Sequence, residues 1–189
     1  MILGLLFTLT LAGAVLGGAA VAGAQETVRW YGIACSHSRI AVPDGLRCRS
    51  TQNYSGGQRG WEADADGTFR NWVAQGSENG SSVFYYLAEA TSSGASIMEG
   101  ASLQKDIRSE MRDGRMTRDF SPLGHRLGAD FMTFTSEHGH ACIGVRRYGP
   151  SQGDGFLWIL YGIRCAPLGG TLGPAEVDAF IGSVRVRAA

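Results

Sequence analysis

The stretch Phe156-Leu157-Trp158-Ile159-Leu160-Tyr161 decides the fold that this sequence predicts. Six successive apolar or aromatic residues place side chains on both faces of an extended chain, which is typical of a strand in the middle of a sheet. The run Val83-Phe84-Tyr85-Tyr86-Leu87-Ala88 has the same property. We therefore expect two central strands, each buried on both sides.

A hairpin is predicted just before residues 156–161. The segments 131–135 and 141–148 are rich in apolar residues and flank the polar turn 137–140. Antiparallel pairing about this turn brings apolar side chains face to face. The predicted pairs are Met132 with Val145 and Phe134 with Ile143.

The four cysteines indicate a covalent framework rather than a redox or zinc motif, because none lies in a Cys-x-x-Cys pair. Three disulfide connectivities are possible. We favour the local one, Cys35–Cys48 with Cys142–Cys165, because each pair brackets a predicted hairpin. Antiparallel pairing about the Gly-rich loop 149–155 also places Cys142 opposite Cys165.

The remaining predicted elements are shorter strands and two helices. Strands are expected over residues 28–35, 46–51 and 69–74. One helix follows the capping box of Ser96 and Glu99, and a second begins after Gly173. Apolar residues at helical spacing mark both helices: Ala101, Leu103, Ile107 and Met111 in the first, and Val177, Phe180, Ile181 and Val184 in the second.

The expected fold class is α+β, because strands predominate and no regular alternation of strand and helix is visible. We expect an antiparallel β-sheet with two main helices packed on it and two hairpin disulfides. The order of strands, helix, meander and helix is similar to that of PsbP/Mog1-like domains. This resemblance implies an α/β/α sandwich as the alternative description.

Residues 1–24 are predicted to be a secretory signal peptide, and residues 25–189 a single exported domain. The apolar run is uncharged and ends in Ala22-Gly23-Ala24, a small-x-small cleavage signature before Gln25. Cleavage after Ala24 would deliver the domain to the periplasm or the exterior, where thiols pair. The alternative is an uncleaved N-terminal membrane anchor, since about 20 apolar residues suffice to cross a bilayer.

The charge balance gives no electrostatic reason to expect nucleic acid or an anionic membrane as a partner. All 17 basic and 17 acidic residues follow the predicted leader, so the net charge is zero. A neutral domain has no electrostatic attraction for nucleic acid. We expect neither a nucleic-acid partner nor a cofactor.

His138 and His140 are the candidate metal ligands. An alternating strand would place both imidazoles on one face with Cys142, which resembles a copper or zinc site. Gly139 between them favours a solvated turn instead, and Cys142 has its own predicted disulfide partner.

Trp61, Arg146 and Arg147 are the candidate contacts for a ligand or partner. Trp61 stands in a Gly-rich loop, where an aromatic side chain is expected to be exposed. Arg146 and Arg147 lie on a predicted strand, where Arg146 would face Tyr161 and stack on its ring.

The sequence contains neither a Gly-x-Ser-x-Gly motif nor a single unpaired cysteine that would indicate a nucleophile. We therefore expect an exported, non-catalytic domain that binds a protein partner or a small ligand. The alternatives are a secreted hydrolase that uses residues of the Gly-rich loops and an envelope protein that handles copper or zinc.

Overall fold

The structure is a computed structural model that describes residues 28–43, 45–55, 68–98, 102–110 and 117–188. The elements in this part of the chain are β1 (Trp30–Ile33), η1 (Cys35–His37), β2 (Arg47–Thr51), β3 (Tyr54–Ser55), β4 (Thr68–Glu78), β5 (Ser81–Ala90), α1 (Leu103–Glu110), β6 (Gly124–Arg126), β7 (Ala129–Thr135), β8 (Ala141–Tyr148), β9 (Ser151–Gln152), β10 (Gly155–Phe156), β11 (Trp158–Cys165) and α2 (Pro174–Ser183).

One large antiparallel sheet organises these elements. Its strand order is β1-β2-β4-β5-β11-β8-β7-β6, and β3 pairs with β4 beside this path. The apolar run in β5 pairs with residues 158–161 of the second run, in β11, at the centre of the sheet, whereas Phe156 of the second run belongs to β10. Their position explains why their side chains are apolar on both faces.

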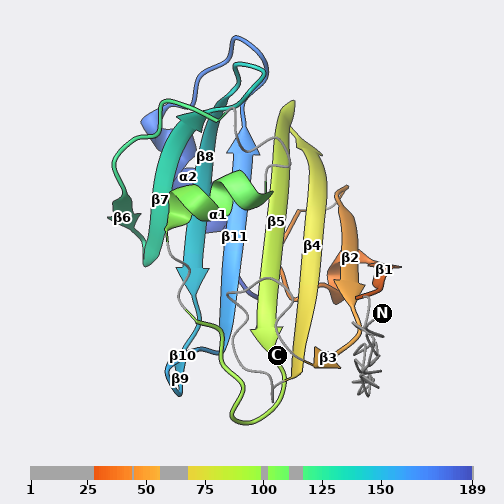
Figure 1. The fold of residues 1–189 in the computed structure, drawn as a ribbon. Coiled ribbons are helices and arrows are strands. Elements are labelled where there is room, and N and C mark those ends of the chain that lie inside the picture. The colour runs from red at the N-terminus through yellow and green to blue at the C-terminus, as the bar shows by residue number, and fades with distance from the viewer. Residues whose placement is uncertain (1–27, 44, 56–67, 99–101, 111–116, 189) are drawn as a thin grey trace, which may run out of the picture.

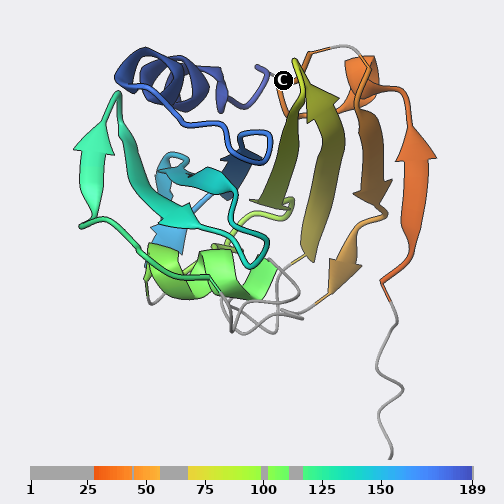
Figure 2. The same cartoon turned by 90° about the horizontal axis from the view of Figure 1, so that it is seen from above.

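Each face of the sheet carries one apolar core and one helix. Leu103 and Ile107 of α1 belong to the core on one face, and Phe180 and Ile181 of α2 belong to the core on the other. Figure 1 shows α1 in front of the sheet and α2 behind it, and Figure 2 shows that neither helix extends over β1 and β2. The predicted α+β class, with an antiparallel sheet and two helices, is confirmed.

Both predicted disulfides are present. Cys35–Cys48 joins η1 to β2, and Cys142–Cys165 joins β8 to β11 at directly paired positions. Each closed loop stabilises the fold by about 3 kcal/mol in the chain-entropy account. Such bonds indicate an oxidising location, periplasmic or extracellular. The predicted leader lies outside the described residues, and no helix within them has the length and apolar character needed to span a bilayer.

The register of the β7–β8 hairpin differs by one residue from the prediction. Met132 pairs with Gly144 and Phe134 with Cys142, so the predicted pairs with Val145 and Ile143 are wrong. The turn contains Gly139 in the left-handed conformation, at a φ of 80°, and the loop closes between Ser136 and His140 with an odd number of residues. The three-residue loop, with Gly139 at the bulge position, replaces the predicted four-residue turn and shifts the pairing by one residue.

Helix α1 begins seven residues after the predicted cap. Ile97, next to the predicted cap Ser96, is held extended because its backbone exchanges two hydrogen bonds with Phe156, at 2.8 and 2.9 Å. Ser102 caps the helix instead, and its Oγ accepts the Lys105 backbone N–H at 3.2 Å. The predicted apolar stripe is correct where it is described, since Leu103 and Ile107 are both buried.

The smaller differences concern the strand ends and the loops. The strand predicted at 69–74 is longer and forms β4, and the predicted loop 149–155 contains most of the β9–β10 hairpin. Strand β6 was not expected, because its turn to β7 uses Leu127 and Gly128 in place of the usual Asn-Gly. The predicted helix start at Pro174 is confirmed.

Candidate functional site

A single row of paired residues crosses the whole sheet on the face that α1 covers. Neighbours in such a row have Cβ atoms about 5 Å apart, so their side chains interact. The row contains charged residues towards both edges and aromatic residues at its centre. From β1 to β6 its members are Gly32, Arg49, Val73, Tyr86, Tyr161, Arg146, Asp130 and His125.

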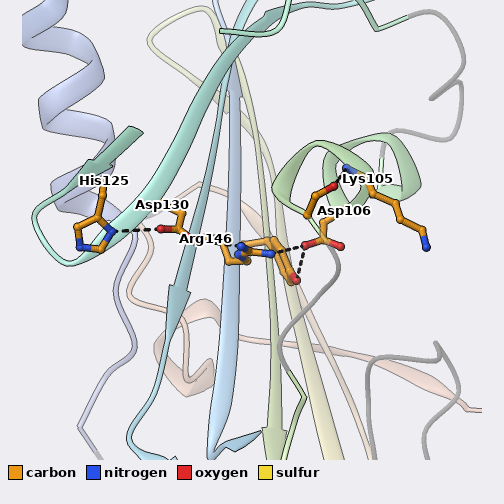
Figure 3. Close-up of polar contacts among 7 residues, drawn as sticks. Lys105, Asp106, His125, Asp130 and Arg146 are labelled. Atoms are coloured by element: carbon orange, nitrogen blue, oxygen red, sulfur yellow. Dashed lines mark hydrogen bonds and ion pairs between the residues drawn. The ribbon is translucent and has the colours of Figure 1, made fainter. Parts of the chain in front are cut away.

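Arg146 is the centre of a buried charge cluster at the β6 end of this row (Figure 3). Its Nη1 donates to Asp106 Oδ2 of α1 at 2.9 Å, and its Nη2 donates to Asp130 Oδ2 at 3.0 Å. The Tyr161 hydroxyl also donates to Asp106 Oδ2, at 3.0 Å, while His125 Nδ1 lies 3.1 Å from Asp130 Oδ1. We call these five residues the Arg146 cluster.

Burial and the neighbouring charges decide the protonation states in the Arg146 cluster. Burial lowers the pKa of Arg146, but the hydrogen bond to Asp130 and the surrounding charges outweigh it, so the net shift is upward. Burial raises the pKa of Tyr161, and the charge and hydrogen bond of Asp106 raise it further. The guanidinium therefore stays charged and the phenol stays protonated.

These states give the Arg146 cluster a structural role. A protonated phenol is neither a base nor a nucleophile, and Asp106 is already bound by two donors. The predicted pairing of Arg146 with Tyr161 is confirmed, although the aromatic ring beneath the guanidinium is that of Tyr148, with a carbon-to-centroid distance of 5.0 Å. The cluster ties α1 to the sheet.

The opposite end of the row opens into a groove at the β1–β2 edge. This groove has a volume of about 560 Å³ and passes beside the Cys35–Cys48 disulfide. Arg47 and Arg49 are both exposed and lie on the same side of β2, two residues apart. The lining residues are Gly32, Ile33, Ala34, Cys35, Leu46, Arg47, Cys48, Arg49 and Gln75.

The two groove arginines carry charges that no described carboxylate neutralises. Neither Arg47 nor Arg49 forms an ion pair with any residue of the described ranges. The guanidinium carbon of Arg49 lies 5.9 Å from the ring centroid of Trp30, which places its charge over the outermost strand. This end of the row is thus suited to bind an anion.

The structure separates the residues that the sequence singled out. Arg146 is only 4% exposed and serves the internal cluster, whereas Arg147 lies on the opposite face and donates from Nη2 to the Ile181 carbonyl oxygen at 3.0 Å. Burial lowers the pKa of Arg147, and the nearby charge of Arg185 lowers it further. Trp61 lies outside the described residues.

The two candidate metal ligands lie on either side of the left-handed Gly139. His138 is exposed, and His140 Nδ1 lies 2.9 Å from the Ala166 carbonyl oxygen. The sulfur of Cys142 belongs to a disulfide. Among the described residues, no three histidine, cysteine or carboxylate side chains are grouped in a way that would hold a metal ion.

The sequence reasoning missed the most informative residues of both ends of the row. Asp106 and Asp130 are far apart in the chain, and nothing in the sequence indicates that both contact Arg146. A signal did exist for Arg47 and Arg49, because they flank Cys48 at alternate strand positions and must point away from the disulfide-bearing face.

Comparisons with known proteins give no relative: no family model matches the sequence, and no curated protein or solved structure is significantly similar to it. The similarity to PsbP/Mog1-like domains thus stays a prediction from element order.

Replacing the centre of the Arg146 cluster should destabilise the fold strongly. Arg146→Met leaves Asp106 and Asp130 beneath α1 without their cation, which should lower the free energy of unfolding by about 3 kcal/mol. Urea unfolding followed by tryptophan fluorescence measures this loss. Arg126→Met is the matched control, since it breaks an exposed ion pair with Asp178 and should cost less than about 1 kcal/mol. Equal losses in the two variants would contradict the anchoring role.

The raised pKa of Tyr161 predicts a loss of stability in alkali. Above the ordinary tyrosine pKa of about 10, the folded state keeps a proton that the unfolded chain releases, so the free energy of unfolding falls as pH rises. Tyr161→Phe should reduce this slope by about 1.4 kcal/mol per pH unit. Urea unfolding curves recorded at several pH values between about pH 8 and pH 11.5 measure this dependence of the free energy of unfolding on pH. Tyr31→Phe, which alters an exposed ring, should leave the slope unchanged.

Proposed function

We propose that this chain is an exported, non-catalytic binding domain whose ligand site is the groove at the β1–β2 edge. The observation that supports this best is the pair of exposed arginines, Arg47 and Arg49, which face a groove of about 560 Å³ without a described ion-pair partner. An anionic ligand would supply the missing counter-charges.

The local sequence strengthens the argument for an anion. The segment 29–51 contains four arginines and only one acidic residue, Asp44, which lies outside the described residues. Arg39 is paired with Glu89, so the local excess of positive charge comes from Arg29, Arg47 and Arg49, in or beside β1 and β2. A local excess of this kind attracts a carboxylate or phosphate ligand within about 10 Å at moderate salt.

The chemistry of the two sites supports a binding role over an enzymatic one. The acid and phenol groups of the Arg146 cluster are engaged with each other, and burial keeps Tyr161 protonated. The groove offers arginine and glutamine side chains, neither of which is a ready general base. These properties suit recognition of charge.

The export part of the proposal is supported by the apolar leader and by two disulfides. Protein recovered from the envelope or medium of its native host should begin at Gln25 and contain four oxidised cysteines. Intact-mass analysis with and without thiol alkylation measures both features. A chain that retains residues 1–24 would instead favour the membrane anchor, and four alkylated thiols would contradict export.

The binding part is tested by titrating the protein, secreted from an expression host through its own leader, with glutarate and with inorganic phosphate. Backbone amide resonances of Gly32, Cys48 and Gln75 should shift in a saturable way that weakens as salt is added. Arg47→Gln with Arg49→Gln should remove the shifts, whereas Arg118→Gln, at an exposed position on the segment that pairs with β7, should not. Shifts confined to other regions, or none at millimolar probe, would contradict this site.

A further inference from the structure

We infer that the groove receives an extended segment of a protein partner with acidic residues at alternate positions, and that this segment pairs with β1 as an additional strand. The inference rests on the proposed function, because it names the class of ligand that the same groove would bind. Three properties of the β1–β2 edge support it: an open strand, a charge placed over that strand, and an apolar opposite face.

Strand β1 is the terminal strand of the large sheet. Its four residues pair with β2 on one side, and no backbone hydrogen bond joins its other side to a described segment. Tyr31 and Gly32 are exposed. Such an edge presents unpaired N–H and C=O groups at strand spacing, which is the arrangement that β-strand addition uses.

Gly32 leaves a path from an added strand to Arg49. Gly32 pairs directly with Arg49, and a Cβ placed on Gly32 would meet no atom within 4 Å. An added strand would lie roughly 10 Å from β2, a distance that a glutamate and an arginine can bridge from opposite sides. Because Arg49 already leans over Trp30, its charge stands above β1 and close to this path.

The other face of β1 favours an apolar neighbour. Tyr31 and Ile33 point to the face opposite Gly32, and the ring of Tyr31 is 41% exposed. Alternate residues of an added strand point to opposite faces, so the matching segment carries carboxylates on one face and apolar residues on the other. Arg47 and Arg49 are two positions apart, which is the spacing of such carboxylates.

The other edge of the sheet is less suited to strand addition. Strand β6 has three residues, and its two charged side chains already have partners, since Arg126 is paired with Asp178 and His125 with Asp130. A short edge with occupied charges offers few contacts. The free edge and the unpaired charge coincide only at β1.

The test uses the peptide Thr-Glu-Val-Glu-Val-Glu-Thr, capped at both ends, with the secreted protein. We expect saturable binding by calorimetry, shifted amide resonances in β1, and slower hydrogen exchange of the β1 amides that face away from β2. Gly32→Glu and Gly32→Gln both fill the path to Arg49, but only the glutamate places a carboxylate beside Arg49 within the chain, so Gly32→Glu should bind the peptide about tenfold more weakly than Gly32→Gln does. Both substitutions enter open space, so both variants should fold.

Two further peptides separate this inference from the proposed function. One has the same composition in the order Glu-Glu-Glu-Thr-Thr-Val-Val, and the other replaces both valines with prolines. Binding at least about tenfold weaker than the parent peptide supports strand addition. Equal binding of all three, together with glutarate shifts in the groove, overturns strand addition and leaves the anion site standing. Absence of binding by the peptides and by glutarate overturns both.

Discussion

The buried charge of Arg146 is the constraint on which the arrangement of this protein depends. A guanidinium beneath a helix requires counter-charges, and they come from two other elements, Asp106 on α1 and Asp130 on β7. These bonds fix where α1 lies on the sheet. The helix then covers the β7–β8 side and does not extend over the β1–β2 side (Figures 1 and 2). The row of paired residues thus holds α1 against the sheet at one end and carries the exposed charge of Arg49 at the other.

Local patterns were sufficient to predict most of the fold. The two apolar runs identify the central strands, and the cysteine positions give the disulfides, because both depend on side chains close in sequence or in a simple hairpin. The errors arise where a distant segment or an unusual backbone conformation determines the local structure. Gly139 permits a three-residue turn in place of the predicted four-residue one, which shifts the strand register by one, and the pairing of Ile97 with Phe156 delays the start of α1. The strand order joins β5 to β11 across a long chain separation, which no local pattern encodes.

The candidate site was harder to predict than the fold for the same reason. The pairing of Arg146 with Tyr161 follows from hairpin register. Asp130 pairs with Arg146 in the β7–β8 hairpin, where the one-residue register error hid it, and Asp106 comes from a helix elsewhere in the chain. Arg47 and Arg49 can be identified as candidate ligand contacts only when β2 is known to lie beside the edge strand of the sheet. Exposed arginines are common and by themselves do not indicate a binding site. An arginine over an edge strand is more informative, because the backbone hydrogen-bonding groups of the strand and the positive charge can then contact the same ligand.

The Cys35–Cys48 bridge crosslinks η1 to β2, and both cysteines are among the residues that line the groove. A nascent polypeptide in the reducing cytosol lacks that bond, so the segment from Ala34 to Leu46 is not yet tied against the sheet. Under the proposed export and binding function, the groove would therefore be completed only after translocation. Disulfide formation would then set the time and place at which the domain could bind a ligand.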